Sequence, residues 1–119
     1  MTLEEAYSKL QGDYEKVMKL LRNPALVKKF ALKFIDDESF ELLEKSLNEK
    51  KYTEAFRAAH TLKGVCLNLC FDKLYLSAAE MTEDLRPGIP TDKTEEIFNR
   101  LKDDYLITVS ALKELSEEL

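Results

Sequence analysis

Apolar residues recur at helical spacing along almost the whole chain, and this periodicity is the feature that most restricts the fold. Three glycines and three prolines in 119 residues leave little material for the tight turns of an all-β protein. Long amphipathic segments joined by short connections pack most simply as an antiparallel up-down-up-down four-helix bundle. The sequence therefore predicts an all-α fold, with residues 1–119 forming a single domain and one or two short N-terminal helices covering one end.

Polar residues just before the apolar segments mark where these helices begin. Their side chains can accept hydrogen bonds from the free amides of a first helical turn, and proline suits the first helical position. The predicted start signals are Thr2 with Glu5, Asp13, Asn23 with Pro24, Asp72, and Asp92 with Glu95. The predicted long helices cover residues 24–49 with a bend near Asp37, residues 52–69, residues 73–86, and a last segment from residue 93 almost to the C-terminus.

The charge and the lack of long apolar runs exclude several classes of protein. Eighteen basic and 23 acidic side chains give a net charge of −5, whereas nucleic-acid and anionic-membrane binders need a basic surface. No apolar run approaches the roughly 20 residues that cross a bilayer, and the N-terminus lacks the features of a signal peptide. We therefore expect a cytoplasmic monomer with no nucleic-acid or membrane partner. The start at Met1 and the lack of a linker favour a free-standing protein.

Cys66 and Cys70 are expected to be reduced thiols in that setting. Their spacing of four residues places them on the apolar face of one helix, so we interpret them as small core residues. A zinc site uses four ligands, and two thiols with one histidine do not supply them. We expect no metal site, and a metal or redox role for these cysteines with His60 is the least favoured hypothesis.

The chain's one histidine, His60, lies in an otherwise apolar helical pattern. Lys63 and Gly64 follow it by three and four residues, which places both beside the imidazole on one helix face. The imidazole lies about 100° from the centre of the apolar stripe, so we expect it at the edge of the core, facing water. A neutral imidazole can attack a phosphoryl group, and Lys63 can offset the negative charge of the product.

Gly64 needs a physical reason, because glycine inside a helix costs roughly 1 kcal/mol relative to alanine. One reason is room for an approaching phosphoryl group or partner backbone. The other is close packing of two helices. Its position in the sequence does not decide between the two.

The segment from Arg57 to Gly64, which reads R-A-A-H-T-L-K-G, resembles the signature A-H-x-L-K-G of histidine phosphotransfer (Hpt) domains. Residues 68–69 and 71–74 also resemble the family's continuation into its next helix. The resemblance extends from about residue 26 to residue 115, including the order and length of the helices. It identifies the chain as similar to a carrier module of His–Asp phosphorelays.

The resemblance implies a specific role for each residue of this cluster. In Hpt domains an exposed histidine on a four-helix bundle takes a phosphoryl group from a receiver-domain aspartate and passes it to another. His60 would then be phosphorylated at Nε2, Lys63 would hold the phosphoryl oxygens, and Gly64 would clear their path. The expected partners are receiver domains of response regulators or hybrid histidine kinases, which supply the acceptor carboxylate and Mg²⁺.

The carrier is not expected to be an enzyme or to hold a cofactor of its own. The family has no kinase activity, and the sequence contains no G-x-x-x-x-G-K-[ST] nucleotide loop. The expected partner-binding residues are Arg57, Thr61, Leu67 and Thr82. The main alternative is a degenerate Hpt-fold interaction module that binds receivers or kinases without phosphotransfer, and the presence of both His60 and Lys63 argues against it.

Three positions depart from the family pattern. Many members have glycine where this chain has Cys70, so we expect a less sharply bent junction between the histidine helix and the next one. Small residues are common where Leu67 stands, and Leu67 can belong either to an apolar docking patch or to the core. Many members also place glutamine on the following helix, facing the histidine. Thr82 stands at the matching position and could still donate a hydrogen bond.

Overall fold

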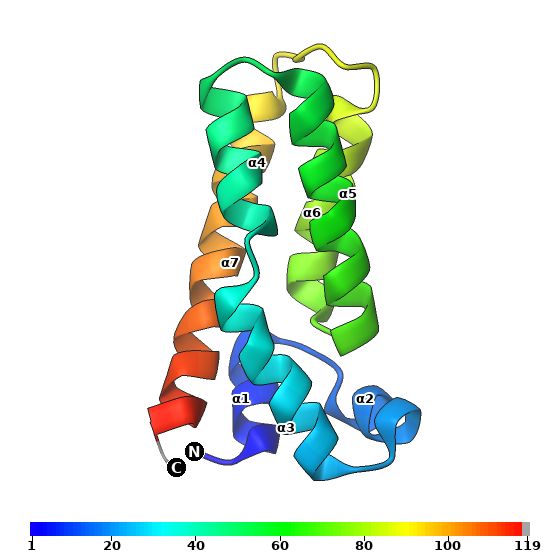
Figure 1. The fold of residues 1–119 in the computed structure, drawn as a ribbon, viewed down its shortest axis with the longest axis vertical. Helices are drawn as coiled ribbons and strands as arrows, with labels where there is room; N and C mark the ends of the chain where they lie inside the picture. Colours follow the sequence, from blue (N-terminus) through cyan, green and yellow to red (C-terminus); the bar gives the residue numbers. More distant parts are fainter. Residues whose placement is uncertain (118–119) are drawn as a thin grey trace.

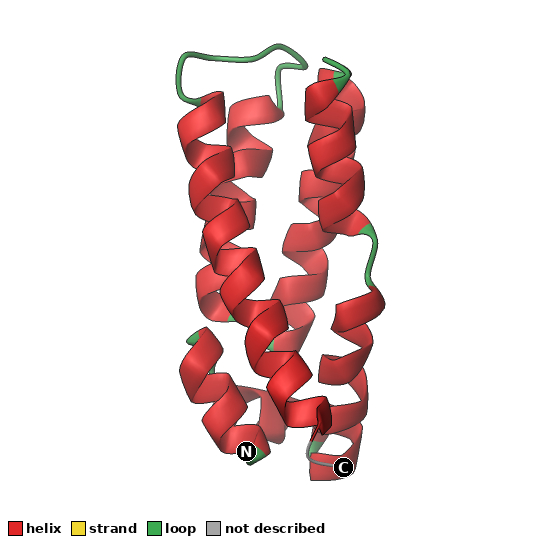
Figure 2. Ribbon diagram, turned by 90° about the vertical axis from the view of Figure 1, so that its left-hand side faces the viewer, coloured by secondary structure: helices red, strands yellow, loops and turns green. Residues whose placement is uncertain are grey.

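Residues 1–117 are described by the computed structural model, and they form helices joined by short turns with no β-strand among them (Figures 1 and 2). The elements are α1 (Leu3–Leu10), α2 (Tyr14–Leu21), α3 (Pro24–Lys33), the 3₁₀ turn η1 (Phe34–Asp36), α4 (Ser39–Asn48), α5 (Tyr52–Leu69), α6 (Asp72–Leu85) and α7 (Thr94–Glu117). The predicted all-α class is confirmed. Within this part of the chain, no helix is both long and apolar enough to cross a bilayer.

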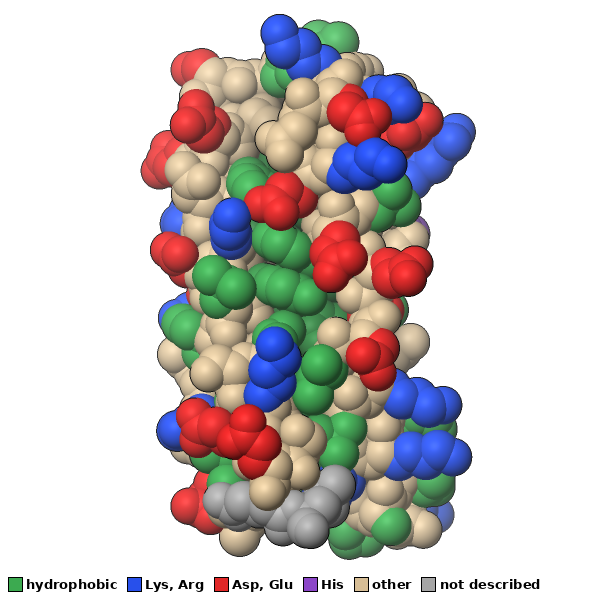
Figure 3. All heavy atoms as spheres, turned by 60° about the vertical axis from the view of Figure 1, so that its left-hand side comes forward, with side chains coloured by type: hydrophobic (Ala, Val, Ile, Leu, Met, Phe, Trp, Pro, Cys, Tyr) green, Lys and Arg blue, Asp and Glu red, His purple; other side chains and the backbone are tan. Residues whose placement is uncertain are grey.

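The four helices α4 to α7 lie side by side, and consecutive ones run in opposite directions (Figure 1). α5 packs against both α4 and α6, and α6 packs against α7. The short helices α1 to α3 gather at the end of the molecule where α5 finishes, with α1 against α7 and α2 against α3. On the face shown in Figure 3, charged side chains of both signs flank a strip of hydrophobic ones.

The predicted start signals of the three N-terminal helices are confirmed. The Thr2 amide donates to Glu5 Oε1 (2.9 Å) and the Glu5 amide donates to Thr2 Oγ1 (3.1 Å), so the capping box is complete. Asp13 Oδ1 accepts from the amide three residues on, at 3.0 Å. Asn23 caps α3, and Pro24 occupies its first turn. Short polar side chains thus satisfy helix amides that have no partner within the helix.

The predicted continuous helix over residues 24–49 is wrong, because the chain breaks where only a bend was expected. α3 ends at Lys33, η1 follows, and Asp37 has extended backbone angles (φ −70°, ψ 130°). Asp37 Oδ1 accepts a hydrogen bond from the Ser39 amide (2.9 Å). An aspartate side chain can take over an amide that would otherwise continue a helix, so the break needs neither glycine nor proline.

The prediction that Asp72 caps the helix after α5 is also wrong. Asp72 is the first residue of that helix, and the residue before it makes no capping hydrogen bond through its side chain. The Lys73 amide donates instead to the Gln11 carbonyl (3.3 Å), in the turn between α1 and α2. A tertiary contact therefore replaces the local cap at this end of α6.

The start of α7 is fixed by threonines rather than by the predicted pair Asp92 and Glu95. The Thr91 amide donates to Thr94 Oγ1 (2.9 Å), and the buried Thr94 hydroxyl donates to Asp84 Oδ2 on α6 (2.6 Å). The helix therefore begins where Thr94 can reach α6, and this contact between distant residues is not visible in local sequence.

Tyr7 fastens α1 to the end of α5. Its hydroxyl donates to the Leu69 carbonyl (2.7 Å), and its fully buried ring lies 5.5 Å from the Phe71 ring, centroid to centroid. The last carbonyls of a helix have no donor within the helix, so the Tyr7 hydroxyl supplies one. The end of the histidine helix is held by a residue more than sixty positions earlier in the chain.

The turn between α1 and α2 also contacts the end of α5. The Asp13 amide donates to the Cys70 carbonyl (2.8 Å). A Cβ on Gly12 would lie 2.6 Å from that carbonyl oxygen and 2.8 Å from the Tyr7 ring. Gly12 is therefore required for this close approach of two backbones.

Cys70 ends α5 in the left-handed conformation that glycine usually adopts. Its φ and ψ are 56° and 39°, and the Phe71 amide reaches back to the Cys66 carbonyl (3.0 Å). This is the hydrogen bonding of a helix end closed by a left-handed residue. The expectation of a less sharply bent junction is wrong, because the cysteine adopts this conformation despite the steric cost of its Cβ.

Candidate functional site

His60 lies in the middle of α5 with its side chain exposed to solvent. Its neighbours Ala59 and Leu62 are fully buried, and Ala58 is almost so. The predicted position at the edge of the core is therefore confirmed. The surrounding apolar residues hold α5 against α4 and α6, so the imidazole is carried on a packed helix rather than on a loop.

An aromatic ring and an ion pair adjoin the imidazole. Phe56, one turn earlier on α5, has its ring centroid 6.1 Å from that of His60. The Arg86 guanidinium, just after α6, lies 5.2 Å from the centre of the Phe56 ring. Arg86 Nε also donates to Glu83 Oε2 at 2.7 Å. The two neighbouring helices therefore meet beside His60 through Phe56, Arg86 and Glu83.

Glu83 brings negative charge to this cluster. Its hydrogen bond from Arg86 lowers the pKa of the Glu83 carboxyl below its ordinary value, and the nearby charges of Arg86, Lys63 and His60 lower it further. Lys63 is half-buried on α5 and forms no ion pair within the described part of the chain. Its ammonium group is thus available for a ligand, while Arg86 already holds the carboxylate.

Gly64 borders open space. A Cβ built on it meets no heavy atom within 4 Å. Close packing of two helices, one of the two reasons considered for this glycine, is therefore wrong. The glycine leaves an uncovered stretch of helix surface one turn past His60.

Three of the four residues expected to contact a partner lie at the surface of α5. Arg57 and Thr61 are exposed, and the Thr61 hydroxyl donates to the Arg57 carbonyl (3.0 Å). Leu67 is 51% exposed, so it is not tucked into the core. Since His60, Gly64 and Leu67 are four and then three residues apart, they form one stripe along the helix.

The family model described as the Hpt domain matches residues 37–118, which is most of the chain. The chain belongs to the Hpt domain family. Hpt domains are histidine-containing phosphotransfer modules of phosphorelays, and they carry phosphoryl groups rather than catalyse a reaction. The match starts at Asp37, so α1, α2, α3 and η1 lie outside it. No significant match was found among curated proteins or solved structures.

Thr82 does not face a partner in this Hpt domain. Its side chain is fully buried, and its hydroxyl donates to the Ala78 carbonyl one turn earlier on α6 (2.7 Å). The expectation that Thr82 binds a partner is wrong, because the inward face of α6 that carries Ala78 and Leu85 also carries Thr82. The next residue, Glu83, is exposed and lies near His60 instead.

The two cysteines are core residues of the Hpt domain. Both are free thiols and nearly inaccessible to solvent, and burial raises the pKa of each above its ordinary value. A protonated buried thiol is a poor metal ligand and a poor nucleophile. Cys66 and Cys70 also point away from the exposed His60, which leaves the metal or redox hypothesis without geometric support.

Sequence reasoning missed Phe56, Glu83 and Arg86 as neighbours of His60. Phe56 precedes the histidine by four residues, so helical spacing could have indicated it. Glu83 and Arg86 belong to the end of α6, and no local pattern shows that this end packs beside His60. They become visible only when α5 and α6 are placed together.

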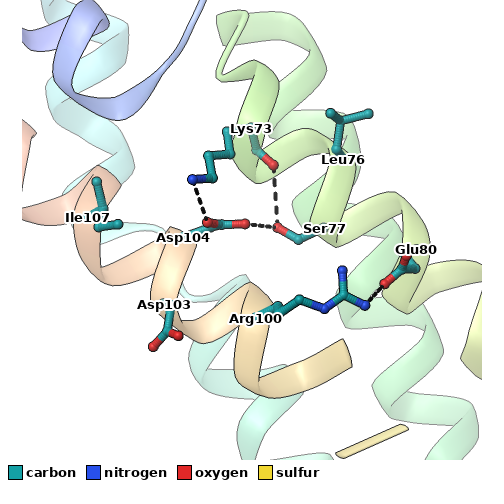
Figure 4. A pocket seen from close by; sticks show the side chains of 8 residues that line it. All are labelled: Lys73, Leu76, Ser77, Glu80, Arg100, Asp103, Asp104 and Ile107. Carbon is teal, nitrogen blue, oxygen red and sulfur yellow. Dashed lines mark hydrogen bonds and ion pairs between the residues drawn. The ribbon is translucent and has the colours of Figure 1, made fainter. Parts of the chain in front are cut away.

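A separate hollow lies between α6 and α7, and it contains none of the predicted site residues (Figure 4). Asp104 accepts from the Ser77 hydroxyl (2.9 Å) and pairs with Lys73 (3.7 Å). Arg100 pairs with Glu80 across the same gap. These charges satisfy one another between two helices, so we interpret the hollow as a polar seam of the fold.

Proposed function

We propose that this protein is a phosphoryl carrier of a His–Asp phosphorelay, with His60 as the phosphorylated residue. The observation that supports it is the exposed His60 with Lys63 one turn away and open space at Gly64, on a chain of the Hpt family. The helices α4 to α7 would be the up-down-up-down bundle of such a module. The helices α1 and α2 would cover the end where α5 finishes.

The proposed transfer is a direct exchange between two side chains. The Nε2 lone pair of neutral His60 attacks the phosphorus of a receiver's aspartyl phosphate. The N–P bond forms as the bond from phosphorus to the aspartate oxygen breaks, and the carboxylate leaves with the electron pair. The proton on Nδ1 stays, and transfer to the next receiver is the reverse reaction on another aspartate.

Lys63 and Gly64 would serve the transferred group, and the receiver would supply the rest. The Lys63 ammonium offsets the negative charge of the phosphoryl oxygens as they approach. Gly64 leaves those oxygens a path that a side chain would narrow. The acceptor carboxylate and Mg²⁺ belong to the receiver, because neither a cofactor nor a kinase site is needed on the carrier. Arg57, Thr61 and Leu67 would contact the receiver around His60.

The experiment uses receivers labelled with radioactive phosphate and measures label on the intact protein. We expect wild type to take up label in a form that is labile in acid and stable in base, and His60→Gln to take up none. Equal labelling of His60→Gln would refute His60 as the site. If tight receiver binding occurs without any labelling of wild type, the protein is the degenerate interaction module instead.

Lys63→Ala tests the role of the lysine. We expect slower transfer with an unchanged circular dichroism spectrum and unfolding midpoint, since Lys63 has no ion pair within residues 1–117 whose loss would lower stability. Lys63→Arg keeps the charge and is the matched control. A Lys63→Ala protein that transfers at the wild-type rate would remove Lys63 from the mechanism.

A further inference from the structure

The charge of the chain is strongly segregated. Residues 14–33 contain six lysines and arginines and one acidic residue, which gives this segment a net charge of +5. The other 99 residues have a net charge of −10, and the whole chain has −5. The six are Lys16, Lys19, Arg22, Lys28, Lys29 and Lys33, and none forms an ion pair within residues 1–117. The negative net charge of the whole chain argued against a basic binding surface, yet this segment provides one.

Apolar side chains are exposed among these cations. Leu20 on α2 is 59% exposed, and Leu26 and Phe30 on α3 are 37% and 39% exposed. Leu26, Lys29, Phe30 and Lys33 follow helical spacing and share one face of α3, where the Lys33 ammonium lies 5.7 Å from the centre of the Phe30 ring. Figure 3 shows Lys and Arg side chains gathered with hydrophobic ones at the edge where α3 lies. We call the six cations with these three residues the α2–α3 surface.

The α2–α3 surface adjoins the stripe that carries His60. That stripe runs through Gly64 and Leu67 toward the end of α5. There the buried Cys70 accepts a hydrogen bond at its backbone carbonyl from the amide of Asp13, just before α2. Ten residues of helix separate His60 from Cys70, or about 15 Å. One partner in a standard interface covers about 800 Å², a disc of roughly 16 Å radius. A protein centred on His60 would therefore reach the start of α2.

We propose that the α2–α3 surface is a second docking area, which binds an acidic surface of the receiver domain whose aspartate exchanges phosphate with His60. This inference rests on the proposed function and extends it to the choice of partner. The surface lies outside the part of the chain that matches the Hpt family, residues 37–118, so it belongs to this chain's own N-terminal segment.

Charge complementarity favours a receiver over the other candidate, an anionic bilayer. The Mg²⁺ of a receiver is held through carboxylates near its aspartate, so a receiver presents negative charge near the surface that meets the carrier. Cations at the rim of an interface that have no ion pair within residues 1–117 attract such a partner and speed its association. A bilayer would meet the same cations but would repel the −10 carried by the rest of the molecule.

The test compares two triple charge reversals of the intact protein. Lys19→Glu/Lys29→Glu/Lys33→Glu alters the surface. Lys45→Glu/Lys93→Glu/Lys113→Glu alters exposed lysines elsewhere on the molecule that have no ion pair among residues 1–117. Each changes the net charge from −5 to −11, so general repulsion is matched. The second-order rate of phosphotransfer is measured with the receiver that labels wild type fastest, over a series of salt concentrations.

We expect the surface variant to transfer about tenfold more slowly than the control variant at low salt, with the difference shrinking as salt increases. The rate at saturating receiver should stay the same. Equal slowing of both variants would overturn the inference while leaving the carrier function intact. A wild type that accepts no phosphate refutes both. If the surface variant does not fold, the corresponding lysine-to-glutamine variant replaces it, with the same expected order of rates.

A vesicle experiment tests the competing possibility that the α2–α3 surface binds an anionic bilayer. Wild type is sedimented with vesicles of equal parts phosphatidylserine and phosphatidylcholine, and with phosphatidylcholine alone, at about 0.15 M salt. We expect no binding to either. Binding to the anionic vesicles that the surface variant loses, together with equal transfer rates of the two variants, would assign the surface to a membrane and overturn the proposal.

Discussion

Replacing Gly64 with alanine should stabilise the protein and impair its transfer. The added Cβ meets no atom within 4 Å, so no steric cost offsets the gain in helix propensity, which is roughly 1 kcal/mol inside a helix. In a domain of this size that gain raises the midpoint of thermal unfolding by about 4 °C. The same methyl group would stand in the open space beside His60 and hinder an approaching phosphoryl group by about tenfold to a hundredfold.

Two measurements on the same samples separate these effects. Urea unfolding gives the stability change, and single-turnover transfer from a labelled receiver gives the rate. Asn68→Ala, at an exposed position one turn past Gly64 and two turns past His60, is the matched control and should stabilise the helix without slowing transfer. Gly64→Leu should slow transfer more than Gly64→Ala. A stabilised Gly64→Ala protein that transfers at the wild-type rate would refute the access argument, and a destabilised one would refute the open geometry.

Three further predictions concern the support of α5. Tyr7→Phe should lower the free energy of unfolding by about 1–2 kcal/mol, because the buried Leu69 carbonyl loses its donor; a change near zero in urea unfolding would contradict this. Cys70→Gly should be more stable than Cys70→Ala by about 1 kcal/mol, since only alanine keeps a Cβ at positive φ; the reverse order would contradict it. Burial raises the pKa of the Cys66 thiol in the folded state, so stability should be full below the unfolded thiol pKa of about 8.5 and fall as pH rises above it. Cys66→Ala should flatten that decline in urea unfolding measured from neutral to alkaline pH, and an unchanged slope would contradict it.

The histidine helix was predictable because its signals are local. A polar turn precedes Tyr52 and apolar residues then keep helical spacing to Leu69, and these are the bounds of α5 in the structure. The break at Asp37 was visible only as a bend, because it depends on which amide the aspartate side chain takes. The capping residues of α6 and α7 were assigned wrongly, because contacts with Gln11 and Asp84 on other elements take the place of the local caps.

The site divides in the same way. The exposure of His60 and its closeness to Lys63 and Gly64 follow from residue spacing within one helix, so both could be predicted from the sequence. Glu83 and Arg86 depend on how two helices meet. Thr82 is the instructive error, because Ala78 and Leu85 already mark its side of α6 as buried, and the family comparison outweighed that periodicity.

The contact between the α1–α2 turn and the end of α5 bears on where this module can be cut. The recognisable family segment starts at residue 37, yet Tyr7 and Asp13 supply donors to carbonyls at the end of the histidine helix. A fragment trimmed to the family boundary would leave those carbonyls and the Phe71 ring uncovered. The segment that matches the family is therefore shorter than the segment that packs around the end of α5. Any fusion or transplant of the His60 helix should keep the first 36 residues attached.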